Sequence, residues 1–427
     1  MRIKKYDIFN RFWISLLIPK MRMLCTKTHL QAGIQSRPSS CNALRTISRN
    51  SAKPPTAIFV IIYMGTLTSI ATAVPRYGQK QMQIFEVVKK IHANTEEDER
   101  KLRFMYRSSG IDTRYSVVPD FCPDIGDSKL LVNDSDTTIQ RKLEDRLTIY
   151  DDEAIKLAAE VVEKCLPDEI ERDKITHLIT VSCTGVKAPG IDIGLIQRFN
   201  LRSDICRTSV NFMGCYAAIH GLKQAYYITE KDIDAKVLLV CVELCTLHFQ
   251  TDRTIDNVTS TIIFGDGAAA ALIEGDNART SGWQLADFYS EINFDGIDDM
   301  AWRISANGFL MTLTSQIPAI LERTCDAVIG RALQRYNIGK DDVDLWCVHP
   351  GGKKILEAIE RGADITKEQL NASYEVLRDY GNMSSPTVLF VLEKMIRNSP
   401  HRAKKKNMVG MAFGPGLTLE TFYLYHV

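Results

Sequence analysis

The run Lys236–Glu243 (KVLLVCVE) constrains the fold of this 427-residue chain more than any other feature. Its apolar residues are continuous, which is typical of a strand that is covered on both faces in an α/β sheet. Short apolar strands are also predicted at His177–Ser182 and Asp344–Val348. Strand and helix patterns alternate twice along the chain, with a break near residues 276–308. The sequence therefore predicts an α/β protein of two similar halves.

The remaining elements are predicted from the spacing of apolar residues. Helices are expected at Gln79–Arg107, Leu147–Cys165, Cys215–Thr229, Gln316–Tyr336 and Ser385–Asn398. Strands are expected at Met408–Ala412 and Leu417–Tyr425, and a strand pair or one bent strand at Thr261–Ile273.

Charge is distributed unevenly along the chain. The totals nearly balance, with 53 Lys and Arg against 52 Asp and Glu, so no basic surface for nucleic acid is expected. Residues 1–63 hold eleven of the basic residues and one acidic residue, Asp7. This segment is predicted to be a basic extension outside the folded part. It is either an organelle transit peptide or the result of a start codon placed too early; we favour the second, because a strand-like run follows Met64.

Two further absences in the sequence limit the possible functions. No apolar run reaches the roughly 18–20 residues of a transmembrane helix. The 11 cysteines are odd in number and none forms a CxxC pair, so neither a disulfide framework nor a zinc site is expected. We therefore expect a cytoplasmic protein without a metal ion, unless residues 1–63 direct import into an organelle.

Three polar residues stand where reactive groups are often found. Cys215 follows Gly214 at the predicted start of a helix, where the helix dipole favours a thiolate nucleophile. His349 ends an apolar strand, and Asn382 lies on a turn before a helix. Each also has a structural interpretation: a buried thiol, a capping or core histidine, and a turn or N-cap asparagine.

Taken together, the three residues suit thioester chemistry. A thiolate paired with an imidazolium can attack an acyl thioester. A histidine and a neutral amide can donate hydrogen bonds to the enolate that forms when a neighbouring thioester is decarboxylated. A carboxylate in place of the amide would repel that enolate.

Five segments in order, NFMGCYAAI, IIFGDGAAAALI, CVHPGGKKIL, YGNMSSPTVLFVL and FGPGLTLET, make the chain similar to type III polyketide synthases, the chalcone synthase family of the thiolase fold. The resemblance runs from about Thr66 to the C-terminus. It implies two similar βαβαβαββ halves that form a five-layered αβαβα core. The N-terminal half, residues 64–285, carries the nucleophile, and the C-terminal half, residues 286–427, carries the histidine and the asparagine.

The resemblance also implies roles for individual residues. Cys215 resembles the nucleophile that holds the growing chain, His349 the base and hydrogen-bond donor, and Asn382 its partner in decarboxylation. Residues implied to shape the substrate cavity are Phe264, Met311, Cys183, His248, Ala188 and the turn residues Gly414, Pro415 and Gly416. Ala188 matches a position that reaches into the partner subunit's cavity. Basic residues implied for the coenzyme A phosphates are Lys101, Arg103, Arg107 and Arg114.

The implied activity is iterative condensation of malonyl-CoA onto an acyl-CoA starter, followed by cyclisation to a pyrone, resorcinol or phloroglucinol ring. The family is homodimeric and uses no metal or cofactor. Departures at Met311, Cys183, His248 and Ala188 from the plant pattern, and a similarity of ELCTLHFQ to bacterial members, favour an aliphatic starter. Two alternatives remain: an enzyme of the same fold that makes a single condensation, as ketoacyl-ACP synthase III does, and an inactive acyl-CoA-binding homologue.

Overall fold

A computed structural model describes residues 65–426, apart from 123–127, 135–136, 276–281, 307 and 400–404. The predicted basic extension, residues 1–63, lies outside the described residues. Every described residue belongs to one unit, which comprises residues 43–427. None of the helices within the described ranges is long and apolar enough to span a bilayer.

A mixed sheet of nine strands forms the framework, in the order β13-β14-β15-β10-β1-β9-β8-β6-β7. Strands of the N-terminal and C-terminal halves lie on opposite sides of the β1–β10 contact, which consists of the pairs Thr66–Gln284 and Leu67–Trp283. The strands are β1 (Thr66–Ala73), β6 (His177–Ser182), β7 (Cys206–Asn211), β8 (Lys236–Leu244), β9 (Asp266–Glu274), β10 (Trp283–Ile292), β13 (Leu345–Val348), β14 (Lys406–Gly414) and β15 (Thr418–His426).

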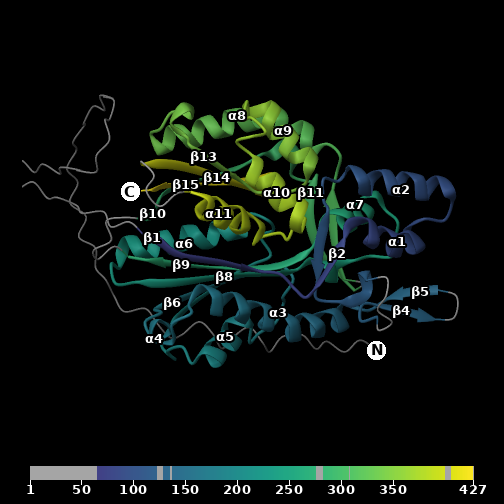
Figure 1. The fold of residues 1–427 in the computed structure, drawn as a ribbon, viewed down its shortest axis with the longest axis horizontal. Coiled ribbons are helices and arrows are strands. Elements are labelled where there is room, and N and C mark those ends of the chain that lie inside the picture. Colours follow the sequence, from purple (N-terminus) through teal and green to yellow (C-terminus); the bar gives the residue numbers. More distant parts are fainter. Residues whose placement is uncertain are drawn as a thin grey trace, which may run out of the picture. The chain divides into compact units, whose positions relative to one another are not determined.

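Strand β8 shows why its sequence is apolar throughout. Leu238 and Val240 face one hydrophobic cluster, formed with the helices α3 and α5, whereas Leu239 and Cys241 face a second cluster, formed with α6 and α11. Strand β14 likewise divides its residues between the second cluster and a third, which contains α8 and α9. Figure 1 shows the resulting layers in order: α8 and α9, the part of the sheet with β13–β15, α6 and α11, the part of the sheet with β8 and β9, and α3 and α5. This is the predicted αβαβα arrangement.

The helices extend as follows: α1 (Gln81–His92), α2 (Glu96–Ser108), α3 (Leu143–Cys165), α4 (Glu169–Arg172), α5 (Ile191–Phe199), α6 (Ala217–Lys231), α7 (Ile255–Ile263), α8 (Ile317–Tyr336), α9 (Lys353–Ala363), α10 (Asn371–Tyr380) and α11 (Thr387–Asn398). Among the described residues, three antiparallel pairs lie outside the large sheet: β2 (Tyr77–Lys80) with β3 (Thr113–Ser116), β4 (Leu131–Asp134) with β5 (Thr137–Gln140), and β11 (Met300–Ser305) with β12 (Gly308–Leu313).

Two parts of the sequence prediction are corrected. The segment Thr261–Ile273 is not a strand pair: its first residues complete α7, and β9 begins at Asp266. Helix α7 has apolar residues at 255, 258, 262 and 263, which is helical spacing, and Thr254 caps it by accepting the N–H of Asn257. Strand β7 was not predicted, because its sequence CRTSVN is polar and most of its residues are exposed at the sheet edge.

Candidate active site

Cys215 lies in a tight connection between β7 and α6. Phe212 and Gly214 adopt positive φ angles of 62° and 83°, and the helix begins at Ala217, two residues later than predicted. A Cβ atom on Gly214 would lie 2.2 Å from Cδ of Pro415. Glycine is therefore required here both by backbone conformation and by close packing.

The turn that includes Gly414, Pro415 and Gly416 packs against this connection. It follows β14, and a Cβ on Gly414 would lie 2.5 Å from the ring of Tyr216. The predicted cavity-shaping turn is thus placed directly beside the candidate nucleophile. Cys183 lies on the other side, where its Sγ accepts the N–H of Gly214 at 3.0 Å.

The side-chain amide of Asn382 lies beside the sulfur of Cys215, which is 3.9 Å from Nδ2 and 4.0 Å from Oδ1. Its Oδ1 accepts the N–H of Ser384 at 2.7 Å, which fixes the orientation of the amide. Its Nδ2 then lies 3.9 Å from Cys215 Sγ and donates to the carbonyl of Gly351 at 3.2 Å. The backbone of Asn382 forms hydrogen bonds with both neighbours of Phe264. Its N–H donates to the Ile263 carbonyl and its carbonyl accepts the Gly265 N–H, each at 2.9 Å.

His349 directly follows β13. Its backbone N–H donates to the Met411 carbonyl at 2.8 Å. The chain continues to Gly351, whose carbonyl accepts the hydrogen bond from Asn382. The side chain is buried, and no described residue is a hydrogen-bond partner of either ring nitrogen. Because an unsatisfied buried nitrogen is costly, the imidazole is well suited to contact a bound substrate.

Burial favours the neutral forms of both reactive groups. It raises the pKa of the Cys215 thiol to about 11, although hydrogen bonds with Ser384 and Asn382 act in the opposite direction. It also lowers the pKa of His349 to about 3. Burial alone thus favours a thiol and a neutral imidazole in the resting site.

A cavity that reaches this region at Phe264 contains three of the predicted substrate-binding residues, whereas Cys215, His349 and Asn382 are not among the residues that line it. Phe264, Met311 and His248 line it, together with Cys245, Trp302 and Phe309. Sequence reasoning did not select the last three, because nothing in β11, β12 or the turn after β8 marks them locally. Ala188 lies elsewhere: it is exposed on the loop that follows β6.

The four basic residues predicted to bind coenzyme A are not equivalent. Lys101, Arg103 and Arg107 lie on α2, where Lys101 and Arg103 form ion pairs with acidic residues of the same helix. Arg114 is instead buried, since it lies on the inward face of β3. Its guanidinium donates to Gln81 Oε1 and to the Phe264 carbonyl. The prediction that Arg114 contacts coenzyme A phosphates is therefore corrected: this arginine is buried and holds the backbone of Phe264.

One buried acid close to the nucleophile was not predicted from the sequence. Glu243, at the end of β8, is fully buried and accepts hydrogen bonds from the Cys183 N–H, the Thr184 hydroxyl and the Ser385 hydroxyl at 2.9–3.1 Å. The available signal was an acidic residue that ends an otherwise apolar run, because a charged group is seldom buried without partners.

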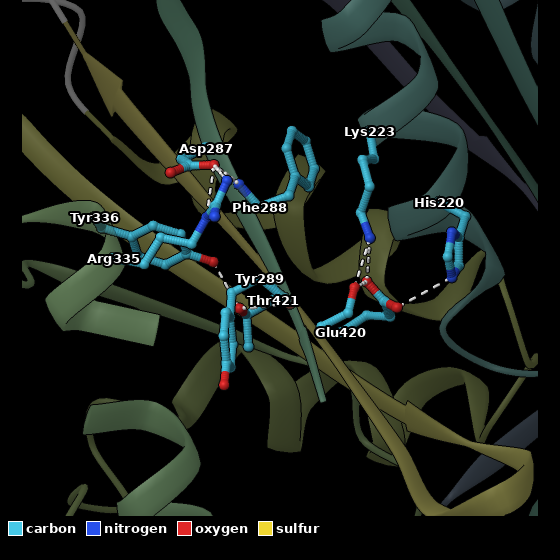
Figure 2. A network of polar contacts seen from close by, with 10 residues as sticks. His220, Lys223, Asp287, Phe288, Tyr289, Arg335, Tyr336, Glu420 and Thr421 are labelled. Atoms are coloured by element: carbon cyan, nitrogen blue, oxygen red, sulfur yellow. Dashed lines mark hydrogen bonds and ion pairs between the residues drawn. The ribbon is translucent and has the colours of Figure 1, made fainter. Parts of the chain in front are cut away.

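A second polar network anchors the helix that follows Cys215. Figure 2 shows that His220 and Lys223, both on α6, converge on Glu420 of β15. The ion-pair distances are 3.1 Å from His220 and 2.7 Å from Lys223, and Ser290 of β10 also donates to this carboxylate. Burial opposes ionisation of Glu420, but these hydrogen bonds prevail and hold its pKa below the ordinary value. The network ties α6 to the strand that follows the turn at Gly414.

We expect Glu420→Ala to lower the free energy of unfolding by about 3 kcal/mol, because it leaves Lys223 partly buried without its partner. Urea denaturation measures this change. The matched control is Glu291→Ala. Glu291 pairs with Arg331, and both side chains are more exposed than those of the Lys223–Glu420 pair, so its loss should cost at most about 1 kcal/mol. Equal losses in the two variants would contradict an anchoring role for Glu420.

Comparison with known proteins gives a consistent result. Residues 63–277 match the family model of the N-terminal domain of chalcone and stilbene synthases, and residues 292–427 match that of the C-terminal domain. The chain is 30% identical to the protein named "Alpha-pyrone synthesis polyketide synthase-like Pks18" of Mycobacterium tuberculosis over 86% of this chain and 91% of that protein. It is 28% identical to a putative chalcone synthase of Bacillus subtilis, over 84% of this chain and 97% of that protein.

A solved structure shows the same architecture. The crystal structure of PKS-I from the brown alga Ectocarpus siliculosus superposes with a TM-score of 0.78 at 28% identity, and the match covers 86% of this chain and all of that one. The chain belongs to the chalcone and stilbene synthase family and is a type III polyketide synthase with a thiolase-like fold.

Proposed function

We propose that this enzyme extends an acyl group held on Cys215 with two-carbon units from malonyl-CoA, in repeated decarboxylative Claisen condensations. The observation that carries the proposal is the amide of Asn382, whose N–H group is fixed 3.9 Å from Cys215 Sγ by Ser384 and Gly351. This arrangement offers a nucleophile and a neutral hydrogen-bond donor at one point of the structure.

The first step transfers the starter from coenzyme A to Cys215. Because the thiol and the imidazole are both neutral at rest, His349 acts as a general base that removes the thiol proton while sulfur attacks the acyl carbon. A new C–S bond forms, the C–S bond to coenzyme A breaks, and the proton on His349 passes to the departing thiolate.

The second step generates the carbon nucleophile. Malonyl-CoA loses carbon dioxide, and the negative charge that remains on the thioester oxygen accepts hydrogen bonds from Asn382 and from protonated nitrogen of His349. The enolate carbon then attacks the acyl carbon on Cys215 and releases the thiolate. The extended chain is now a thioester of coenzyme A, and it returns to Cys215 by the same exchange as in the first step. The buried site favours decarboxylation, since a localised carboxylate is poorly solvated there.

The starter and the product are proposed from the cavity lining and from one relative. The cavity wall formed by Phe264, Met311 and Phe309 is apolar, which suits an aliphatic starter, and the mycobacterial relative is named for α-pyrone synthesis. We expect acyl-CoA starters with alkyl chains to be converted to pyrones or resorcinols. A panel of acyl-CoAs with malonyl-CoA, analysed by mass spectrometry, tests this. Clear preference for coumaroyl-CoA over all fatty acyl-CoAs would contradict it.

Met311 is expected to set the space available for the starter. We expect Met311→Phe to shift the preferred starter to a shorter chain, because a rigid ring replaces a flexible side chain in the cavity wall. The same acyl-CoA panel measures the shift, and Met300→Phe on the neighbouring strand β11, outside the cavity lining, is the control. An unchanged chain-length profile in Met311→Phe would contradict this role.

We also propose a homodimer formed through β7. This strand is at the edge of the sheet, most of its residues are exposed, and an exposed edge can pair with a second copy across a two-fold axis. Val186 and Ala188, on the loop after the adjacent strand β6, are exposed beside it. Sedimentation equilibrium should give about twice the chain mass of 48.1 kDa. A monomer at micromolar concentration would contradict the proposal.

Two further proposals concern the binding of coenzyme A and the location of the protein. Lys101, Arg103 and Arg107 are proposed to attract the phosphates of acyl-CoA and malonyl-CoA by charge. No disulfide joins the cysteines of the described ranges, which agrees with a reducing, cytoplasmic location. N-terminal sequencing of the native protein tests whether residues 1–63 are retained.

A further inference from the structure

Two polar side chains connect the cavity to a fully buried carboxylate, that of Glu243. His248 lines the cavity, and its ring lies edge-on to Trp302 and Phe309, with centroids 4.6 Å and 4.3 Å away. Its Nε2 lies 3.0 Å from the hydroxyl oxygen of Thr184. The same hydroxyl lies 3.1 Å from Oε2 of Glu243. The side chains thus form a continuous chain, His248–Thr184–Glu243.

Hydrogen-bond directions along this chain are coupled. The Thr184 hydroxyl has one hydrogen, and an ionised Glu243 can only accept it. His248 must then donate from Nε2 to Thr184, which leaves Nδ1 with a free lone pair. No described residue is a partner of that Nδ1. If Glu243 is protonated, every bond reverses and Nδ1 carries the hydrogen. One proton accepted at Nδ1 is therefore equivalent to one proton delivered to Glu243.

The surroundings of His248 favour passage of a proton through its ring over a stable imidazolium. Arg146 is buried behind the histidine and donates to the carbonyls of Leu247 and Phe249, the residues on either side. Burial, together with this cation, holds the pKa of His248 well below its ordinary value, so an imidazolium is disfavoured. The ring can still pass a proton by changing tautomer.

Glu243 is suited to be the terminal acceptor. Burial raises its pKa to about 7, with the hydrogen bonds from Cys183, Ser385 and Thr184 acting in the opposite direction. The titratable groups that face it are Tyr150 and the thiols of Cys183, Cys215, Cys241 and Cys245. Burial raises the pKa of each of these, so all are neutral near pH 7. Asp266 lies beyond Cys245, and burial raises its pKa to about 6.

We infer that His248, Thr184 and Glu243 form a proton relay that drives ring closure of the extended chain on Cys215. The inference rests on the proposed function, of which it is the last step. The enol O–H of the chain gives its proton to Nδ1 of His248, while Nε2 gives its own to Thr184 and the threonine hydroxyl hydrogen passes to Glu243. The enol oxygen attacks the thioester carbon, a C–O bond forms, the C–S bond breaks, and Cys215 leaves as a thiolate.

The cavity also supplies a complementary donor. Trp302 lines the same cavity, and no described residue accepts a hydrogen bond from its Nε1. A β-dicarbonyl chain in its enol form carries one donor, the enol O–H, and one acceptor, the neighbouring ketone. His248 Nδ1 and Trp302 Nε1 match this pair, whereas a purely alkyl chain would leave both unsatisfied. Once the product has left, Glu243 loses its proton to water and the Cys215 thiolate takes one up, which restores the resting state.

Thr184 variants test the relay without touching the residues that load the starter. In quenched reactions analysed by intact-protein mass spectrometry, we expect Thr184→Val to load starter on Cys215 and to accumulate the fully extended chain, with release slowed about 100-fold. Thr184→Ser, which keeps the hydroxyl, should restore release to within about tenfold of the native rate. His248→Gln, whose amide can bond to Thr184 but cannot exchange tautomers, should accumulate the same species.

The pH dependence gives a second readout. Because the relay needs ionised Glu243, release should rise with pH through about 7 and level off above it, and this dependence should disappear in Thr184→Val. Normal loading with unslowed release in both Thr184→Val and His248→Gln would overturn the relay alone. A flat native profile between about pH 5.5 and 8.5 would overturn it too. Native protein that never carries an acyl group on Cys215 would instead overturn the proposed function.

Discussion

The Cys215→Ser variant is expected to lose at least about 1,000-fold in product formation from any acyl-CoA and malonyl-CoA. A serine hydroxyl is a far weaker nucleophile than a thiol and is much harder to deprotonate. The loss should appear in the maximal rate, because Cys215 contributes to chemistry and not to holding coenzyme A. Quantification of product by mass spectrometry measures it.

The control for this prediction is Cys325→Ala in the outer helix α8. Cys325 is buried and belongs to the hydrophobic cluster of α8 and α9, whereas Cys215 is half-buried and precedes Tyr216 of the second cluster. We expect that variant to retain most activity with some loss of stability. Substantial polyketide formation by Cys215→Ser would show that the acyl group is carried elsewhere.

Asn382→Asp should reduce condensation at least about 100-fold, although it changes the side chain by one atom. The N–H group 3.9 Å from Cys215 Sγ becomes a carboxylate oxygen, which repels both the departing thiolate and the enolate. Release of labelled carbon dioxide from malonyl-CoA, measured apart from starter loading, locates the defect in decarboxylation.

A matched change at Asn200 separates this effect from a general response to added charge. Asn200 is exposed and ends α5 in the left-handed conformation, which aspartate also adopts. Asn200→Asp should decarboxylate malonyl-CoA at the native rate. If Asn382→Asp did so as well, the amide would have no part in stabilising the enolate.

The α/β class and the two similar halves were predictable because their signal is local, whereas the five-layered order was implied only by the family resemblance. The apolar run of β8 needs two covered faces, and hydrophobic clusters do lie on both sides of it. The segment Thr261–Ile273 was misjudged because a short apolar run at the end of a helix resembles a strand. Strand β7 was missed because an edge strand that is exposed need not be apolar.

The site was predictable only where motifs carried it. Nothing local shows that Arg114 points inward from a four-residue strand, since a shift of one residue would have turned it toward solvent. Glu243 depends on Cys183, Thr184 and Ser385, which are 59–142 positions away in the chain. The neutral state of Cys215 and His349 depends on burial, which tertiary packing determines and a helix-start position does not reveal.

The most direct test of this account is to locate the acyl group itself. Native protein is incubated with radiolabelled acyl-CoA alone, quenched in acid and digested with trypsin. The account predicts label on the peptide Thr208–Lys223, which contains Cys215 as its one cysteine, at up to one equivalent per chain. Label on a different cysteine peptide, or no stable acyl-enzyme under conditions in which product forms, would contradict it.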